Sequence, residues 1–459
     1  MRSTRSPFHR LLQSEIVKKL ATIVDRNGYE HDFKRFTIPL PSGHFNLQST
    51  EMTFGVKSIF RIAPVPQVGQ STPMHEDWIQ PILDEAQAQG LERMARVYPE
   101  VGGKLHVDGQ EVLNFASNDY LDLARHRHVI DRSREALEKY GAGATASRLV
   151  AGTLPIHEEL EARMAREKGF PAALIFGAGY LANAGTIPVL VGRDDLIFAD
   201  KFIHASMIDA CKLSGAKLVR FSHNCVRALE QRLEQFSEFS GRKLILTESV
   251  FSMDGDIAPL TKIAALAQTH SAMFMVDEAH STGTFGPNGA GLVRELGLEK
   301  SVTISMGTIS KAMAGYGGFV ACSEKMRRLL VQSARAFIYT TAPPPAIIGA
   351  ALGVMDIFES SPRLGNILQA NAEYFRSLLH AADLDTLQSQ SQIIPIMIGD
   401  NEKAVAISQK LRAQGIIAPA IRPPTVPAGT ARLRLSITLA HHVDDLERAA
   451  QCIITAVQN

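Results

Sequence analysis

From about residue 110 onward, short apolar runs of strand length alternate with segments of helical periodicity. The runs are continuous rather than interrupted by polar residues, which is typical of strands covered on both faces. The seven predicted strands are Ala172–Phe176, Leu196–Ala199, Lys217–Phe221, Lys243–Leu246, Ala272–Val276, Val302–Met306 and Gly318–Cys322. Strands that alternate with helices predict an α/β fold with a large, mostly parallel sheet.

One predicted helix between these strands ends before Gly169 and carries Ile156, Leu160 and Met164 at four-residue spacing. Thr153 suits the N-cap of this helix, because a hydroxyl there can accept from a free backbone N–H. Gly169 suits the left-handed position that follows the last turn.

We expect four parts along the chain. Residues 121–345 carry the strand pattern and form the large domain, which residues 76–120 lead into. Longer helices with few strands predict a smaller α+β domain over residues 346–459. Residues 1–75 hold 10 Lys and Arg against 5 Asp and Glu, and their end is rich in Pro, Gly, Ser and Gln, which indicates an N-terminal extension. An alternative is that residues 1–30 act as an organelle transit peptide.

Composition excludes several classes of protein. Of the 459 residues, 45% are apolar and 21% are charged, as in an ordinary globular protein. Lys plus Arg (48) nearly equals Asp plus Glu (47), which argues against a nucleic-acid binder. The four cysteines are far apart with no CxxC pair, so neither a disulfide scaffold nor a cysteine zinc site is expected, and a reducing, cytoplasmic location fits.

One uncharged stretch has the length of a membrane span. It covers the 24 residues from Gly169 to Gly192. Its prolines and glycines, among them Pro171, Gly177 and Pro188, predict a strand, a turn and a helix instead, and we expect no membrane segment.

A glycine-rich turn follows the first predicted strand. Gly177–Ala182 matches G-x-G-x-x-A, the pattern of a dinucleotide-binding turn. The match alone is weak, because small residues at a helix N-terminus accommodate any anion, including a single phosphate. An NAD-dependent oxidoreductase therefore remains one hypothesis.

Reactive side chains follow other predicted strands. Lys311 lies in Thr308-Ile309-Ser310-Lys311, where a partly desolvated amine could form a Schiff base. Asp277 ends a strand, where a buried carboxylate needs a cationic partner, and His204 could stack on an aromatic ring. Each residue has an ordinary alternative role. Lys311 could be a surface lysine, Asp277 a helix N-cap and His204 a hydrogen-bonded histidine. A metal site from Asp277 and His280 lacks a third ligand, so none is expected.

Five of these loops share one position in the predicted fold, namely Gly177–Ala182, His204, Glu248–Asp256, Asp277 and Thr308–Lys311. Each follows the carboxyl end of a strand, and parallel strands bring those ends to one crevice. One cofactor explains the set better than five coincidences. The chemistry matches pyridoxal phosphate (PLP), with a glycine turn and hydroxyls for the phosphate, an amine for the aldehyde and a carboxylate for the ring nitrogen.

The span from about Leu91 to Gln458 resembles the α-oxoamine synthases, which are fold-type I PLP enzymes. The resembling strings are Asn114–Leu121, Arg220–Asn224, Val250–Asp256, Thr308–Lys311, Ile338–Pro344 and, most specifically, Ile421–Leu435. The resemblance implies an aspartate-aminotransferase-like fold and a homodimer with shared active sites. It is strongest to members that condense L-alanine with a pimeloyl thioester in biotin biosynthesis. A sister enzyme using glycine or another acyl thioester is the alternative, and a non-catalytic relative is disfavoured by the intact reactive residues.

The resemblance also implies residue roles. Lys311, His204, Asp277 and His280 would be catalytic. The cofactor would be held by Gly179, Tyr180, His204, Ser252, Asp277, His280, Thr308, Lys311 and, from the partner subunit, Thr341. Substrates would meet Arg93 (Arg96 in another alignment register), Asn118, Arg422, Thr425 and Arg434, the last as a fork for the amino-acid carboxylate.

Two residues depart from the family pattern, which usually has glycine at both positions. They are Asp122 and Ser249. Asp122 is expected to place a charge near the mouth of the cleft, where it could alter acyl recognition.

Overall fold

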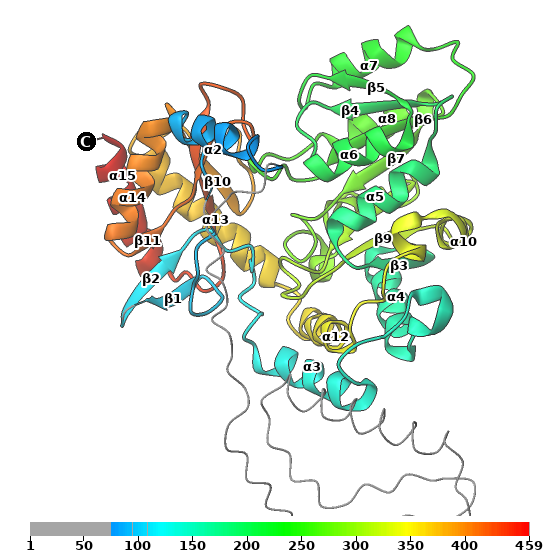
Figure 1. Cartoon of the computed structure of the whole chain (residues 1–459), viewed down its shortest axis with the longest axis horizontal. Helices are drawn as coiled ribbons and strands as arrows, with labels where there is room; N and C mark the ends of the chain where they lie inside the picture. Colours follow the sequence, from blue (N-terminus) through cyan, green and yellow to red (C-terminus); the bar gives the residue numbers. More distant parts are fainter. Residues whose placement is uncertain (1–74, 94, 108, 459) are drawn as a thin grey trace, which may run out of the picture. The chain divides into compact units, whose positions relative to one another are not determined.

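The computed structural model describes residues 75–93, 95–107 and 109–458. The chain separates after His75, and the unit described below is Glu76–Asn459 (Figure 1). The predicted extension over residues 1–75 and the transit-peptide alternative fall almost entirely outside the described residues.

A seven-stranded sheet forms the centre of the large domain. Its strands are β3 (Ala172–Phe176), β4 (Leu196–Asp200), β5 (Lys217–Phe221), β6 (Lys243–Glu248), β7 (Met273–Asp277), β8 (Ile304–Thr308) and β9 (Gly318–Cys322). Their order is β3-β9-β8-β7-β6-β4-β5, and only β9 runs antiparallel to its neighbours. The predicted α/β fold and all seven strands are confirmed, with shifts of at most two residues at their ends.

Helices cover both faces of this sheet (Figure 1). They are α4 (Pro155–Lys168), α5 (Gly179–Leu190), α6 (Ala205–Ser214), α7 (Val226–Gln235), α8 (Leu260–Thr269), α9 (Leu292–Glu295), α10 (Glu324–Ser333) and α11 (Arg335–Ile338). Alternate residues of one strand therefore enter different cores: Ile197 of β4 belongs to one buried cluster and Phe198 to another. Burial on both faces explains the continuous apolar runs, since each such side chain contributes about 1.5–3 kcal/mol when fully buried.

The predicted caps of α4 are half right. Gly169 ends the helix in the left-handed conformation with φ of 74°. The N-cap prediction is wrong, because Leu154 occupies that position. The hydroxyl of Thr153 instead donates to the carbonyl of Arg148, at 2.6 Å, and therefore fastens the preceding π-helical turn Arg148–Gly152.

Two small sheets and three helices lie outside the large sheet, and all but two of their strands come from the C-terminal part of the chain. One sheet has the order β10-β13-β12 (Ile393–Gly399, Ala431–Ser436 and Ala420–Ile421), and the other has the order β1-β2-β11 (Lys104–Val107, Gln110–Asn114 and Ile416–Ile417). The helices are α13 (Leu364–His380), α14 (Asn401–Ala413) and α15 (Val443–Gln458). Because β2 pairs with β11, the segment entering the fold is bound to its C-terminal part (Figure 1).

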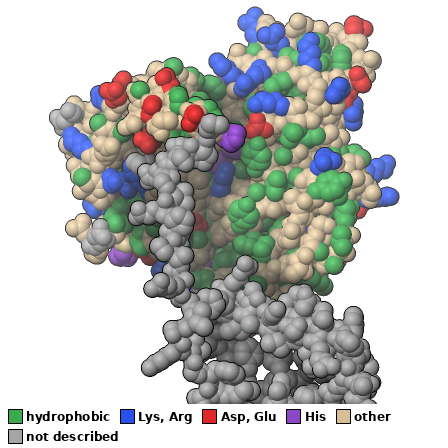
Figure 2. Space-filling model, viewed as in Figure 1, with side chains coloured by type: hydrophobic (Ala, Val, Ile, Leu, Met, Phe, Trp, Pro, Cys, Tyr) green, Lys and Arg blue, Asp and Glu red, His purple; other side chains and the backbone are tan. Residues whose placement is uncertain are grey.

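The remaining helices are α2 (Ile79–Ala88), α3 (Arg127–Tyr140) and α12 (Pro345–Ser360), of which α3 and α12 pack against each other. No helix in the described part of the chain is long and apolar enough to cross a bilayer. The uncharged stretch Gly169–Gly192 forms β3 and α5, as predicted. Side chains of both charges are scattered over the visible face, in keeping with the near-neutral composition (Figure 2).

Candidate active site

The carboxyl ends of the parallel strands surround one cavity of about 170 Å³. Its lining brings together most of the residues predicted to hold the cofactor: Gly179, Tyr180, His204, Asp277, His280, Thr308 and Lys311. Asn183, Ser206, Glu248, Ala279 and Met306 complete the lining. The crevice follows from topology, because five strands of one sheet end at the same edge.

Asp277 ends β7 and is only 5% exposed. One carboxylate oxygen accepts from the backbone of Ala279 and the other from Nδ2 of Asn183, both at 2.9 Å. No helix begins at Asp277, so it is not an N-cap. Its negative charge is held by neutral donors, and it can still pair with a cation entering the cavity.

Lys311 lies three residues beyond β8, with its Nζ 2.7 Å from Nε2 of His280. Burial lowers the pKa of Lys311 to about 8, although the charges of Asp277 and Glu248 oppose this shift. A substantial fraction of the amine is therefore neutral near pH 7–8, as a nucleophilic amine requires.

His280 is buried on the same side of the cavity. Its Nδ1 lies 2.6 Å from the hydroxyl of Tyr120, a wholly buried residue. Burial, with the charges of Lys311 and Arg434, holds the pKa of His280 well below its usual range. The imidazole is therefore neutral beside the lysine.

His204 caps α6, its Nδ1 accepting from the backbone of Ser206 at 3.2 Å. The residue remains exposed and lines the cavity. Partial burial lowers the pKa of His204, and the charge of Lys311 acts in the same direction while Asp277 opposes it. The hydrogen bond to the start of α6 therefore fixes the His204 ring, and the lowered pKa favours its neutral form.

Glu248 ends β6 directly opposite Asp277 in the strand register. The side chain is buried and accepts from the backbone of Ser252 at 3.3 Å through Oε2, while Oε1 has no hydrogen-bond partner among the described residues. Burial, and then the charge of Asp277, raises the pKa of Glu248 well above its usual range. Burial therefore favours the protonated form of Glu248 more than water does.

The start of α5 forms one end of the cavity. The cap residue Ala178 provides no side-chain hydrogen bond, so the first N–H groups of the helix stay available. A Cβ added at Gly179 would lie 3.3 Å from Cε of Met306, which explains the glycine at this close approach. Thr308 holds the facing loop by donating to the carbonyl of Gly317 at 2.8 Å.

A second cavity of about 560 Å³ shares His204 with the first and is lined by Ser252 and Thr425. Arg434 in β13 lies behind it, only 6% exposed. Its Nε donates to the carbonyl of Ser252 at 2.7 Å, and its Nη atoms both lie 3.5 Å from Oδ1 of Asn118. Asn118, Thr425 and Arg434 therefore do not line the lysine cavity itself.

Arginines gather in a third hollow, of about 420 Å³. Arg93 and its alternative Arg96 both line it, with Arg422 and Arg412. Thr341 lies elsewhere: it is exposed and pairs with Ser147 in an isolated β-bridge. Within one chain, these residues and Lys311 do not share a cavity.

Three residues of the site were not singled out from the sequence. Asn183 lies four residues after Gly179, so helical spacing places it one turn into α5 on the same face. Glu248 stood only as the first residue of the candidate loop Glu248–Asp256, with no role of its own. Tyr120 stood in a family-like string, but its contact with His280 joins positions 160 residues apart.

The structure also shows the surroundings of the two residues that depart from the family pattern, Ser249 and Asp122. Ser249 is wholly buried, donates to the carbonyl of Asp277 at 3.2 Å and lies 2.8 Å from the hydroxyl of Ser281. Asp122 lines none of the three cavities above, and its effect on acyl recognition stays a prediction. It has a positive φ of 55°, which explains why glycine suits that position.

Among the described residues, one group could in principle surround a metal ion: His223, Asp254 and Asp256. The nitrogens of His223 lie 2.9 Å from Asp200 and 2.8 Å from Asp256. These two carboxylates raise the pKa of His223 to about 10 against the effect of its burial. A protonated imidazole cannot bind a metal, and Asp254 pairs with Arg432, so the group is an ion-pair cluster.

The fold and the site together define a fold-type I PLP-dependent transferase architecture. The chain belongs to the aminotransferase class I and II family, whose model matches residues 110–453. It is 44% identical over 370 residues to 8-amino-7-oxononanoate synthase of Geobacter sulfurreducens, a match covering 80% of this chain and 94% of the relative. Within the family it is therefore an α-oxoamine synthase, most like the 8-amino-7-oxononanoate synthases, as its sequence strings predicted.

Two solved structures are similar to the chain. A serine palmitoyltransferase variant of S. paucimobilis with a bound PLP–myriocin aldimine has a TM-score of 0.78 at 32% identity and covers 84% of this chain and 98% of its own. The 8-amino-7-oxononanoate synthase of Francisella tularensis has a TM-score of 0.65 at 32% identity and covers 76% and 98%. The relatives support an enzyme of biotin synthesis.

Proposed function

We propose that this enzyme binds PLP and condenses L-alanine with a pimeloyl thioester, releasing CO2 and the free thiol and forming 8-amino-7-oxononanoate. The observation that carries the proposal is the pairing of Lys311, with its lowered pKa, and the buried carboxylate of Asp277 in one cavity.

The residues present fit the cofactor. The free N–H groups at the start of α5, beside Gly179 and Tyr180, suit the phosphate, together with Thr308. Asp277 suits the ring nitrogen, and the face of His204 suits the ring. The carbonyl oxygen of Asn183, buried without a partner among the described residues, is a further polar group that a ligand could satisfy.

The bound cofactor would supply an electron sink for the negative charge that develops at Cα of the amino acid. The chain's own residues do the rest. Asp277 keeps the ring nitrogen protonated, and Lys311 removes and returns the proton at Cα. His280 stays neutral and holds the Lys311 nitrogen on the cavity side.

Substrate positions follow from the neighbouring cavities. Arg434, buried and already fixed by Ser252, presents its guanidinium fork toward Asn118 and suits the carboxylate of alanine. The second cavity, with Thr425, suits the acyl chain, and Arg93 and Arg422 suit its anionic end.

We further propose that two copies share their active sites. Thr341 lines none of the three cavities described above and would reach the phosphate of the partner's cofactor. Large apolar side chains are exposed beside it: Tyr339 (70%) precedes it by two residues, and Val150 (82%) follows its bridge partner Ser147. Figure 2 shows apolar side chains gathered on one half of the visible face. An apolar surface of this kind is typical of an interface.

Absorbance spectra and product assays test the proposal. The purified protein, after addition of PLP, should absorb near ~420 nm, as expected of a lysine-bound pyridoxal. Alanine and then glycine or serine are added with pimeloyl or palmitoyl thioesters, as CoA and carrier-protein forms, and products are identified by mass. A preference for serine with palmitoyl thioester would favour the sister activity of the structural neighbour, and no absorbance would contradict the cofactor.

A further inference from the structure

His223 contacts two segments that line the second cavity, without lining that cavity itself. Its Nδ1 lies 2.9 Å from Oδ1 of Asp200, and its Nε2 lies 2.8 Å from Oδ2 of Asp256. Both carboxylates are buried. The family-like string Arg220–Asn224 contains this histidine, but the function proposed above uses none of its residues. The cluster is therefore an unassigned feature beside the proposed acyl site.

The His223 ring needs a proton on each nitrogen to make both contacts. A neutral imidazole has one N–H and can donate to only one of two carboxylates. Against the effect of burial, Asp200 and Asp256 raise the pKa of His223 to about 10, so the ring is an imidazolium at neutral pH. It donates to both carboxylates, one from each nitrogen, and joins them through a rigid, planar group.

Asp200 connects His223 to the first wall of the cavity, residues 201–205. The carboxylate oxygen that faces His223 also accepts from the backbone N–H of Phe202, at 2.8 Å. The rings of His223 and Phe202 have their centroids 4.7 Å apart. This wall also carries His204, which lines both cavities. Its place therefore depends on Asp200 and His223.

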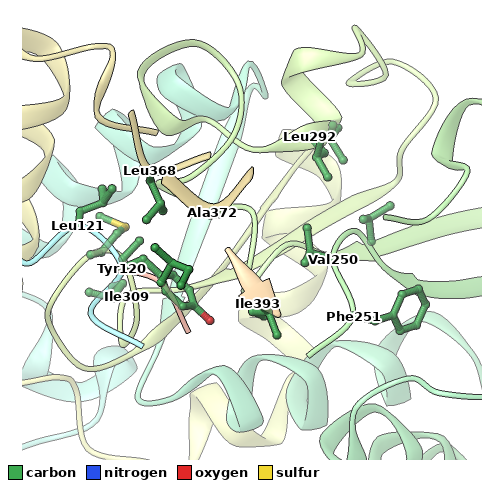
Figure 3. Packing of buried hydrophobic residues seen from close by; sticks show 14 of the residues in the cluster. Tyr120, Leu121, Val250, Phe251, Leu292, Ile309, Leu368, Ala372 and Ile393 are labelled. Carbon is green, nitrogen blue, oxygen red and sulfur yellow. The ribbon is translucent and has the colours of Figure 1, made fainter. Parts of the chain in front are cut away.

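Asp256 connects His223 to the second wall, residues 251–254. The backbone carbonyl of Asp256 accepts from the N–H of Phe251 at 3.0 Å, which closes the loop between them. The rings of His223 and Phe251 meet edge to face, with centroids 4.4 Å apart. Phe251 is packed in the core with Val250, so this wall has a fixed base (Figure 3).

One imidazolium thus holds two walls of the same cavity, each through a different nitrogen. We propose that His223 is a positioning residue for the acyl donor, which sets the separation of residues 201–205 and 251–254 and thereby selects the acyl chains that fit. The inference rests on the proposed function in taking the second cavity as the acyl site. A pocket with fixed walls distinguishes chains that differ by one methylene by about tenfold or more.

The test measures acyl binding without turnover. Pantetheine thioethers that carry glutaryl, pimeloyl or azelaoyl-length chains are titrated into the full chain, with PLP added, by calorimetry. Pantetheine is the part that CoA and carrier-protein donors share. The native protein should prefer the pimeloyl-length chain by about tenfold or more. The affinity for alanine, followed by the absorbance of the cofactor, is measured in parallel.

His223→Gln should relax this preference. The amide of glutamine has its donors on one nitrogen only, so it cannot donate to both carboxylates. We expect the affinity for the pimeloyl-length chain to fall about tenfold and the preference over the other two chains to disappear, while the affinity for alanine stays the same. A merely structural role would lower the amount of folded protein and leave the preference among chains as it was.

His128→Gln is the matched control. His128 pairs with Asp356 at 2.9 Å from α3, and neither residue lines the second cavity. The variant removes a histidine–aspartate pair of the same kind, and it should change neither the chain preference nor the affinity for alanine.

Asp200→Asn provides a second route if His223→Gln folds poorly. Both oxygens of Asp200 accept from N–H groups, so an amide there brings two donors into contact. It should relax the chain preference as His223→Gln does. A native chain preference retained in both variants, or equal binding of the three chains by the native protein, would overturn the proposal. No binding of any chain to the native protein would contradict the acyl site of the proposed function itself.

Discussion

Two lysines contact residues that follow β7 and differ in the kind of partner they have. Lys168, at the end of α4, is 2% exposed and lies 2.5 Å from the carboxylate of Glu278. Lys311 is paired with a neutral imidazole nitrogen, and within the described part of the chain no carboxylate forms an ion pair with it. Glu278 directly follows Asp277, the residue whose charge opposes the lowering of the Lys311 pKa by burial.

The comparison shows that a lysine removed from water can serve stability, when a carboxylate pairs with it, or reactivity, when its pKa falls. Glu278 accepts further hydrogen bonds from Ser305, at 2.7 Å, and from the backbone of Val293, at 2.9 Å, so the carboxylate beside Lys168 has several donors. Lys311 lacks such a counter-charge in contact, and burial lowers its pKa to about 8. Lys311, which has no carboxylate in contact, is therefore the lysine expected to react.

Removal of Lys311 should have the largest effect on activity and little on stability. In Lys311→Ala we expect turnover to fall on the order of 10³-fold or more and the absorbance near ~420 nm to disappear. No ion pair is broken, so the thermal midpoint of the cofactor-free protein should not fall. Steady-state assays, spectra and thermal melts check this, and substantial residual turnover would remove Lys311 from its role.

Removal of Lys168 should do the reverse. Lys168→Met leaves Glu278 buried without its counter-charge, which costs about 3–5 kcal/mol of unfolding free energy. The double variant Lys168→Met/Glu278→Gln removes both charges and should recover most of that loss. Denaturant unfolding measures both, and an equal loss in the two variants would mean that packing, rather than charge, sets the cost.

His223 shows the opposite balance from Lys311, because two carboxylates outweigh the effect of burial. The pKa of the His223 imidazole is raised to about 10 from the ordinary 6.5. The resulting stabilisation is fully present below pH 6.5 and is lost as the pH rises through 10. We expect roughly 1–2 kcal/mol after allowance for solvent screening. Unfolding from pH 6 to 10.5 should show this decline, and His223→Gln should flatten it.

The smallest expected effect concerns Asp122. Its left-handed backbone and the burial that raises its pKa both disfavour aspartate. Asp122→Gly should therefore raise the unfolding free energy by about 1 kcal/mol, while turnover stays the same because the residue lines no cavity described above. A fall in stability would show that its neighbours Lys104 and Arg125 contribute more than the strain costs.

The site was only partly predictable. The residues that follow strands, such as Asp277 and Lys311, could be placed together because parallel strands end at one edge. Asn118 and Tyr120 could be recognised as family-like, but their link to Lys311 depends on side-chain directions. Thr153 was misplaced because its hydroxyl had a nearer partner in the preceding turn.

The sequence by itself determined the α/β layer, its seven strands and the edge at which the reactive residues gather. Burial on both faces leaves a continuous apolar signal, and chain order limits where parallel strands can end. Only the tertiary structure decided which buried lysine is paired and which is left to react. That choice depends on contacts between residues more than 30 positions apart, such as Lys311 with His280 and Lys168 with Glu278, which local pattern does not encode.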